Sequence, residues 1–147
     1  MNKALIQLYL RLALATGYIL LGFDRLGAWG PHGKSWVSWG DWQHFSDYAH
    51  EVMSFLPAGL AEALAVIATA GEISFGVLLL IGLFTRQAAI GSGLLTGCFA
   101  IAMAISGGFT SPINYSVFTV SAASFLLSTL PGYRWSIDAA IARRNAP

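Results

Sequence analysis

The chain has 147 residues, of which 56% are hydrophobic and 10% are charged, with a mean hydropathy of +0.63. Soluble domains carry about a quarter charged residues, so this composition indicates an integral membrane protein. The net charge of +1, without a basic stripe, excludes a nucleic-acid partner. The single cysteine, Cys98, excludes a dithiol relay within the chain, and we expect it to be a small core residue.

The first apolar run covers about residues 4–26 and predicts a membrane-spanning helix. It lacks a small-residue cleavage site and contains Arg11, which favours a retained helix over a cleaved signal peptide. The spacing of Arg11, Tyr18, Gly22 and Arg25 places these four residues on one helical stripe.

A polar segment follows, over about residues 27–57. Its glycines and prolines indicate a loop, and about residues 41–55 then predict an amphipathic helix that Asp41 caps. Tryptophans suit the headgroup level of a bilayer, and this segment contains Trp29, Trp36, Trp39 and Trp42. We expect this helix to lie on the membrane surface.

Three further spanning helices are predicted, over about residues 60–83, 87–106 and 114–130. Small residues line one face of the second and third helices, which favours close packing. Serines form a polar stripe on the fourth helix, and Ser136 opens a short closing helix. The predicted fold is an all-α membrane protein, a single domain over 1–147 with a bundle of four transmembrane helices and an extracytoplasmic amphipathic helix.

The basic residues predict the orientation of the bundle. With the N-terminus inside, five basic residues lie on the cytoplasmic side, and only Arg25 and Lys34 lie outside. This bias favours a multi-pass membrane protein with both termini in the cytoplasm. We expect the membrane to be the bacterial inner membrane. The five cytoplasmic residues are Lys3, Arg86, Arg134, Arg143 and Arg144.

Glu72 is the single carboxylate near the middle of the most apolar stretch, residues 65–86. An ionisable group at that depth is a candidate functional residue, and it needs a partner. If the first two helices begin and end level with each other, helical rise places Arg11 within about 6 Å of the depth of Glu72. We therefore predict an Arg11–Glu72 pair. A similar argument pairs Arg25 with Glu62 or Asp24.

Two interpretations of the buried pair remain open. The pair either only holds helices together, or Glu72 and Arg11 act as the catalytic residues that transfer a proton or bind a polar head group. In the second case, a pocket between the helices holds the ligand. Its predicted binding residues are Asn114, Tyr115, Ser121, Tyr18 and Arg25.

His44, Asp47 and Glu51 share a helix face, with His50 close by. Residues of these types bind zinc in many proteins. The solvated face of an interfacial helix has the same composition, so we expect no metal site here.

The pattern resembles the DoxX family of small four-helix membrane proteins. The first helix reads LRLALATGYILLGFDRLG, the second and third read AGEISFGVLLLIGLFTRQAAIGSGLL, and the end reads YRWSIDAAI. The glutamate followed by GLFTR is the most specific of these similarities. The resemblance covers nearly the whole chain apart from the Trp-rich segment, and it points to Arg11, Arg25 and Glu72.

The resemblance implies two alternative functions. The family is named for a small subunit of a membrane thiosulfate:quinone oxidoreductase, which implies a subunit of a redox complex that passes electrons from a sulfur or thiol donor to quinone. Because this chain has no cysteine pair and no flavin or haem signature, a partner protein or soluble donor would supply the electrons. The alternative is a non-enzymatic binder of small molecules or lipids, or an assembly scaffold. We expect contact with the lipid bilayer and with a protein partner or further copies of the chain.

Overall fold

The computed structural model describes residues 2–145, which form seven helices and no strand. The helices are α1 (Lys3–Asp24), α2 (Trp42–Val52), α3 (Ala58–Ile81), α4 (Thr85–Gly107), α5 (Thr110–Asn114), α6 (Val117–Ser128) and α7 (Ile137–Arg144).

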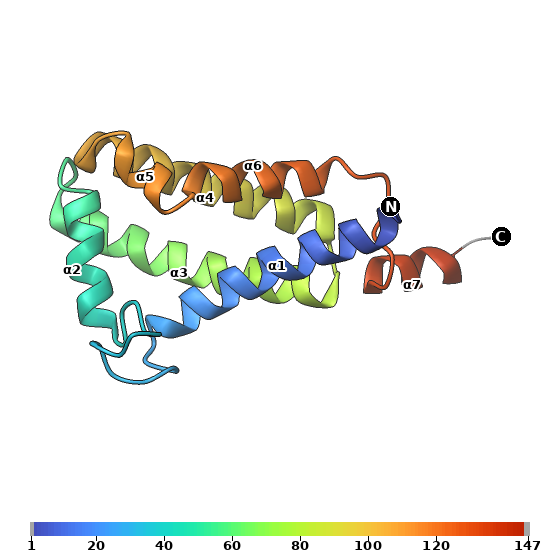
Figure 1. Cartoon of the computed structure of the whole chain (residues 1–147), viewed down its shortest axis with the longest axis horizontal. Helices are drawn as coiled ribbons and strands as arrows, with labels where there is room; N and C mark the ends of the chain where they lie inside the picture. The colour runs from blue at the N-terminus through green and yellow to red at the C-terminus, as the bar shows by residue number, and fades with distance from the viewer. Residues whose placement is uncertain (1, 146–147) are drawn as a thin grey trace.

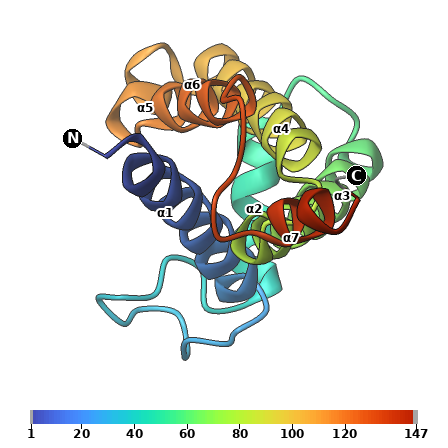
Figure 2. The same cartoon turned by 90° about the vertical axis from the view of Figure 1, so that its right-hand side faces the viewer.

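The helices α1, α3, α4 and α6 form a bundle in which each packs against two others (Figures 1 and 2). The start of α1 and helix α7 lie at one end of this bundle (Figure 1). Three elements lie at the other end: the long loop that follows α1, helix α2 and helix α5 (Figure 1). We refer to these as the termini end and the α2 end.

Three helices, α1, α3 and α4, are long and apolar enough to cross a bilayer. The predicted fourth spanning helix differs from the structure, because residues 114–130 do not form one helix. Ser116 has a φ of 55°, and this left-handed residue separates α5 from α6. The 12 residues of α6 rise about 18 Å, less than the hydrocarbon thickness of about 30 Å.

Small residues set the register between α1 and α3. Gly22 lies against Ile73, and Gly76 lies against Ile19 so closely that an added Cβ would be 2.8 Å from the Ile19 side chain. This close approach aligns the second half of α1 with the second half of α3. It decides which charged residues can meet.

The polar segment contains the predicted helix, although shorter, as α2. Asp41 caps it as predicted, accepting a hydrogen bond from the His44 backbone N–H at 2.9 Å. Phe45, Ala49 and Val52 are buried against α3 and α4. The apolar face of α2 therefore packs on the bundle, and its position at a membrane surface stays a prediction.

The expectation that Cys98 is a core residue is wrong, because its side chain is exposed. The buried stripe of α4 passes through Ser92, Thr96, Ala100 and Met103. Residue 98 lies midway between two members of that stripe, so the helix turns its side chain away from the bundle.

The C-terminal segment is attached to the termini end. Ser136 caps α7 as predicted, accepting a hydrogen bond from the Ala139 N–H at 3.1 Å. The Asp138 carboxylate accepts hydrogen bonds from the backbone N–H groups of Phe84 and Thr85, at 2.9 and 2.8 Å. Asp138 thus caps the start of α4 across the fold, where a negative charge also complements the helix dipole.

Candidate functional site

Glu72 forms an ion pair with Arg25. Arg25 Nη2 lies 2.7 Å from Glu72 Oε2, and both side chains are less than one-tenth exposed. Arg25 Nη1 donates a hydrogen bond to Thr69 Oγ1 at 2.8 Å. Thr69 precedes Glu72 by three residues, so the helical period of α3 turns both side chains toward Arg25.

An aromatic ring from α2 covers this pair. The guanidinium carbon of Arg25 lies 3.9 Å from the centroid of the Phe45 ring, close enough for a cation–π interaction. Arg25 is the last residue of the helical stripe predicted on α1 and immediately follows the helix end. The pair thereby connects α1, α2 and α3 at the α2 end of the bundle.

The predicted Arg11–Glu72 pair is wrong. Arg11 is buried at the termini end, where its Nη2 donates a hydrogen bond to the Trp135 backbone carbonyl at 2.7 Å. It also lies against Gly82, whose Cα hydrogen faces the guanidinium so closely that a Cβ would overlap it. Gly82 has a φ of 68°, which also favours glycine.

The Arg11–Glu72 pair does not form because of the register of α1 against α3. The predicted pairs require Glu62 to be level with Arg25, but α3 begins farther out and extends past the end of α1. The first turns of α3 contact α2 instead, where Glu62 accepts hydrogen bonds from Trp42 Nε1, at 2.9 Å, and from the Ser46 hydroxyl. Glu72 is therefore level with Arg25.

The predicted pairing of Arg25 with Glu62 is wrong for the same reason, and Arg25 forms no ion pair with Asp24 either. Asp24 Oδ2 accepts hydrogen bonds from the backbone N–H groups of Ser38 and Trp39, at 2.9 and 2.7 Å. Asp24 therefore holds the returning loop against the end of α1.

Tyr18 lies in the middle of the bundle, away from Glu72. Its hydroxyl is 2.9 Å from Thr96 Oγ1 and 2.9 Å from Ser124 Oγ. Because Thr96 donates its proton to the Ser92 carbonyl, Tyr18 donates to Thr96 and accepts from Ser124. This chain of hydrogen bonds joins α1, α4 and α6.

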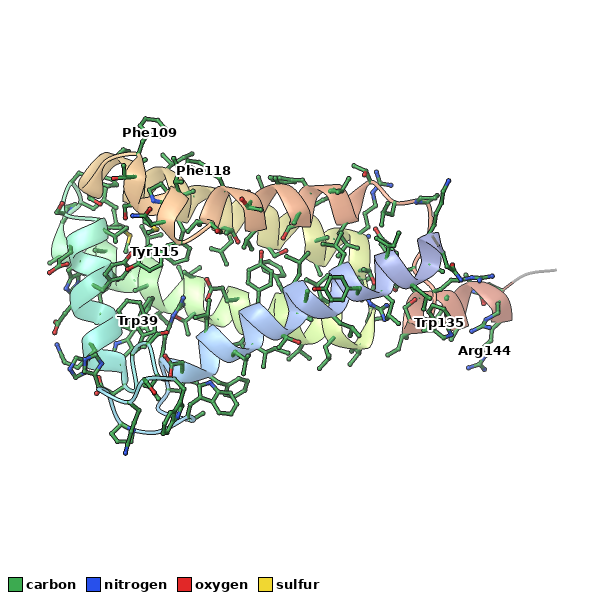
Figure 3. All side chains as sticks on the ribbon, in the orientation of Figure 1. Trp39, Phe109, Tyr115, Phe118, Trp135 and Arg144 are labelled. Atoms are coloured by element: carbon green, nitrogen blue, oxygen red, sulfur yellow. The ribbon has the colours of Figure 1, made fainter. Side chains whose placement is uncertain are left out.

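The remaining predicted residues do not join one pocket. Ser121 is buried and donates a hydrogen bond to the Gly93 carbonyl at 2.7 Å. Asn114, the last residue of α5, and Tyr115, which follows it, are exposed. Figure 3 shows Tyr115 at the α2 end, far from Trp135 at the termini end. The seven predicted site residues thus divide among the two ends, the middle and the surface.

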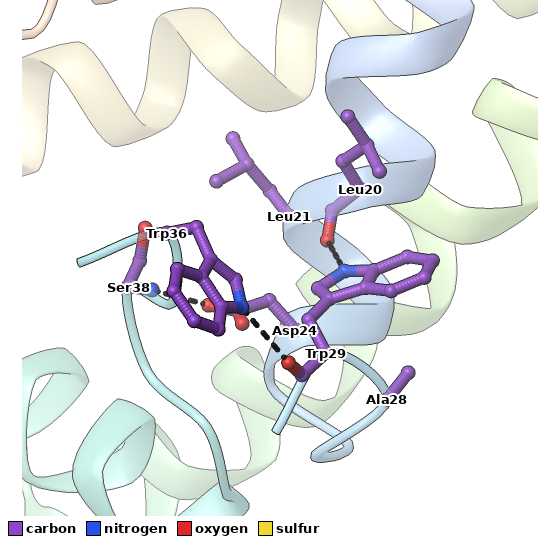
Figure 4. Close-up of a pocket in the computed structure, with 7 residues that line it drawn as sticks. All are labelled: Leu20, Leu21, Asp24, Ala28, Trp29, Trp36 and Ser38. Carbon is purple, nitrogen blue, oxygen red and sulfur yellow. Dashed lines mark hydrogen bonds between the residues drawn. The ribbon is translucent and has the colours of Figure 1, made fainter. Parts of the chain in front are cut away.

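A cavity of about 410 Å³ lies beside the end of α1 (Figure 4). Two indole rings, Trp29 and Trp36, line it together with the apolar side chains Leu20 and Leu21. Trp29 Nε1 donates a hydrogen bond to the Leu20 carbonyl at 2.8 Å, and Trp36 Nε1 donates one to the Trp29 carbonyl at 3.3 Å (Figure 4). Both N–H groups are occupied, which leaves the ring surfaces for contact with a ligand.

Asp24 supplies the polar wall of this cavity with Ser38. Asp24 is buried, and its second oxygen, Oδ1, has no hydrogen-bond partner among the described residues. A buried polar atom without a partner is rare and costly, so it marks a place where a ligand group or water is expected. From the sequence, Asp24 is predicted only as a partner of Arg25, and the tryptophans only as headgroup anchors.

The histidines of the Trp-rich segment stack on each other. The His32 and His44 rings are parallel, with centroids 3.8 Å apart, and His44 Nδ1 lies 2.8 Å from Asp41 Oδ2. The hydrogen bonds from the backbone and side chain of His44 lower the pKa of Asp41. Asp47 accepts a hydrogen bond from Gln43 Nε2 at 2.8 Å. Across residues 2–145, no group of three metal-binding side chains occurs.

Helices of this length and apolarity, with a few charged side chains buried at their contacts, define an integral membrane protein of helical type. A profile of the DoxX family matches residues 6–106. The chain belongs to the DoxX family, a membrane protein family often found in oxidoreductase-related systems. Neither the curated proteins nor the solved structures contain a match to this chain.

Proposed function

We propose that this protein is a quinone-binding membrane subunit of a redox complex, with the quinone ring held between Trp29 and Trp36. The cavity lined by these two indoles carries the proposal. Its volume of about 410 Å³ falls within the range of small-molecule sites. Apolar walls with a few placed polar groups are typical of sites for such ligands.

The residues present fit a quinone head group. Aromatic faces offer offset stacking to a flat ring. Asp24 Oδ1 offers the acceptor that a quinol hydroxyl requires, and the Ser38 hydroxyl offers a donor for a quinone carbonyl. Leu20 and Leu21 are nearly half-exposed on α1. Because α1 is a spanning helix, this side of the cavity faces the surrounding lipid. A quinone tail can remain in the bilayer there.

When bound, a quinone would accept two electrons and two protons on reduction to the quinol. Asp24 accepts a hydrogen bond from the quinol form. The Arg25–Glu72 pair acts as a positioning pair, because it fixes the end of α1 from which Asp24 projects. Electrons come from a partner protein or a soluble sulfur or thiol donor, because a single cysteine cannot cycle as a dithiol.

The basic residues support an orientation with both termini in the cytoplasm. Lys3, Arg86 and the C-terminal arginines all belong to segments at the termini end, whereas Lys34 lies in the loop at the α2 end. The excess at the termini end fits the positive-inside rule. The quinone cavity then lies near the extracytoplasmic surface of the bacterial inner membrane.

The test is mass spectrometry of lipids extracted from protein purified in mild detergent. We expect about one quinone per protein in the wild type, and loss of most of it in Trp36→Leu and Trp29→Leu. Trp135→Leu, at the opposite end, is the matched control and keeps the quinone. Glu72→Gln, which disturbs the positioning pair, is expected to lower quinone retention less than the indole variants do.

The site would be refuted if the wild type retained no quinone, or if Trp36→Leu and Trp135→Leu retained equal amounts of quinone. That result would favour the alternative function, a non-enzymatic binder or assembly scaffold. Because Trp36 is 69% exposed, its replacement leaves the core intact, and a folded variant makes the comparison valid.

A further inference from the structure

A second, larger groove lies at the termini end, between the start of α1, the α3–α4 turn and the C-terminal segment. Its volume is about 1090 Å³. Four basic residues line it: Lys3, Arg86, Arg134 and Arg143. None of the four forms an ion pair with any residue between 2 and 145.

Among residues 2–145, a single carboxylate lines the groove, and it is already engaged. Asp138 accepts hydrogen bonds from the backbone N–H groups of Phe84 and Thr85, at 2.9 and 2.8 Å. Its negative charge therefore complements the N-terminus of α4. The lining keeps an excess of three positive charges, four basic residues against one acidic residue.

Gln7 places an unused hydrogen-bond donor at the groove. Its side chain is 5% exposed, and Oε1 accepts a hydrogen bond from the Arg134 backbone N–H at 3.1 Å. The amide nitrogen Nε2 is buried without a hydrogen-bond partner in the described part of the chain. A buried donor among unpaired cations suits an anionic oxygen acceptor.

Several hydrogen bonds fix the wall of the groove. Arg11 Nη2 donates to the Trp135 carbonyl at 2.7 Å, and the Asp138 backbone N–H donates to the Gly82 carbonyl at 2.9 Å. Together with the hydrogen bond from the Arg134 backbone N–H to Gln7 Oε1, these bonds hold the C-terminal segment against α1 and the α3–α4 turn before any ligand binds. Preorganisation of this kind lowers the cost of binding.

The location of the groove favours a lipid over a free anion. It lies where the spanning helices α1 and α4 begin, which is the depth of phospholipid headgroups. Apolar side chains, among them Leu130 and Phe84, also line it. Trp135 is 57% exposed next to it, as expected for an aromatic residue at the membrane interface. Basic pockets at this depth bind anionic headgroups.

We propose that this groove binds the phosphate headgroup of an anionic phospholipid, through the Gln7 amide and the surrounding cations. The inference does not depend on the quinone cavity, which lies at the opposite end of the bundle. The phosphate oxygens accept from Gln7 Nε2, while Arg134 and Arg143 supply charge at the rim. The bound lipid holds α7 and the start of α1 against the membrane surface.

The test uses vesicles of equal parts phosphatidylglycerol and phosphatidylcholine. After reconstitution and gentle extraction, native mass spectrometry counts the lipids retained on the protein. We expect retained phosphatidylglycerol in the wild type. In the double variant Arg134→Gln/Arg143→Gln, each lost charge lowers retention about fivefold, from roughly 1 kcal/mol per basic residue near an anionic surface.

Two matched variants separate the groove from general charge. Arg144→Gln removes a neighbouring arginine that does not line the groove, and Lys34→Gln removes a charge at the α2 end. Both are expected to retain phosphatidylglycerol like the wild type. Gln7→Glu keeps the acceptor for Arg134 and replaces the buried donor with an acceptor, so it is expected to abolish retention. If Gln7→Glu does not fold, the exposed arginine variants decide alone.

A competition with excess inorganic phosphate distinguishes a lipid from a free anion. Retention of phosphatidylglycerol in the presence of phosphate supports the proposal. Displacement of the lipid by phosphate would overturn it in favour of a free anion. Equal retention in the Arg134→Gln/Arg143→Gln and Arg144→Gln proteins, or equal retention of both lipids, would also overturn it.

Discussion

Replacing Glu72 by leucine tests the central ion pair of the fold. The substitution leaves the Arg25 guanidinium buried, with 5% of the residue exposed, and removes the carboxylate 2.7 Å away. At an effective dielectric constant of about 20, this distance corresponds to a Coulomb attraction of roughly 6 kcal/mol. The cost of desolvating both charges offsets much of it.

The groups that remain around Arg25 limit the loss. Thr69 Oγ1 still accepts a hydrogen bond at 2.8 Å, and the Phe45 ring still lies 3.9 Å from the guanidinium. A cation–π contact in a dry site stabilises by about 2 kcal/mol. Removing one partner of a buried pair costs about 3–5 kcal/mol, so we expect Glu72→Leu to lower the free energy of unfolding by about 3 kcal/mol.

The assay is equilibrium unfolding in mixed detergent micelles, followed by circular dichroism. The matched variant is Arg25→Leu/Glu72→Leu, which removes both charges and leaves no ion unpaired. We expect the double variant to be more stable than Glu72→Leu alone, because no uncompensated charge stays buried. If Glu72→Leu costs under about 1 kcal/mol, or if the double variant loses the sum of both single losses, the reasoning about the pair is wrong.

Three further predictions concern other parts of the fold. Tyr18→Phe removes the hydrogen bonds to Thr96 and Ser124 and is expected to cost about 1–3 kcal/mol in the same unfolding assay, whereas the exposed Tyr9→Phe serves as a neutral control. Asp138→Ala removes the cap of α4 and is expected to cost about 1–2 kcal/mol and to speed amide exchange at Thr85; unchanged exchange would contradict a capping role. Because hydrogen bonds from His44 lower the pKa of Asp41, this residue stabilises α2 above the unfolded pKa of about 3.9, and that contribution disappears as the pH falls through the lowered pKa. Amide exchange at the start of α2 is therefore expected to rise only in that acid range, and Asp41→Asn is expected to remove the step.

The length of α3 explains why the charged residues are separated as they are. Its first turns extend beyond α1 and contact α2 through Glu62. Glu72, in its middle, lies next to Arg25. Its end carries Gly82 to Arg11. One helix therefore organises both ends of the bundle, with an aromatic cavity beside one end and a basic groove at the other.

Several features could be predicted from the sequence because they depend on local pattern. Hydropathy predicts the three spanning helices, since the bilayer sets their length and composition. Residue types favoured at helix starts predict the caps of α2 and α7, formed by Asp41 and Ser136. Helical periodicity predicts the buried stripe of α1, which includes Arg11, Tyr18 and Gly22.

Other features depend on how helices distant in the sequence pack against each other. The partner of Glu72 follows from the register that Gly22 and Gly76 impose on α1 and α3, and no periodicity within one helix encodes that register. The break at Ser116 is a different case: its φ of 55° is a local backbone feature, although the helical pattern of the sequence continues through this residue. The basic groove forms from three segments that only the fold brings together, whereas the aromatic cavity forms within residues 20–38, where the loop turns back against the end of α1. The sequence by itself determined that the chain enters a membrane as apolar helices with buried charges. The tertiary structure decided which charges pair, because side-chain volume at the helix contacts sets the register.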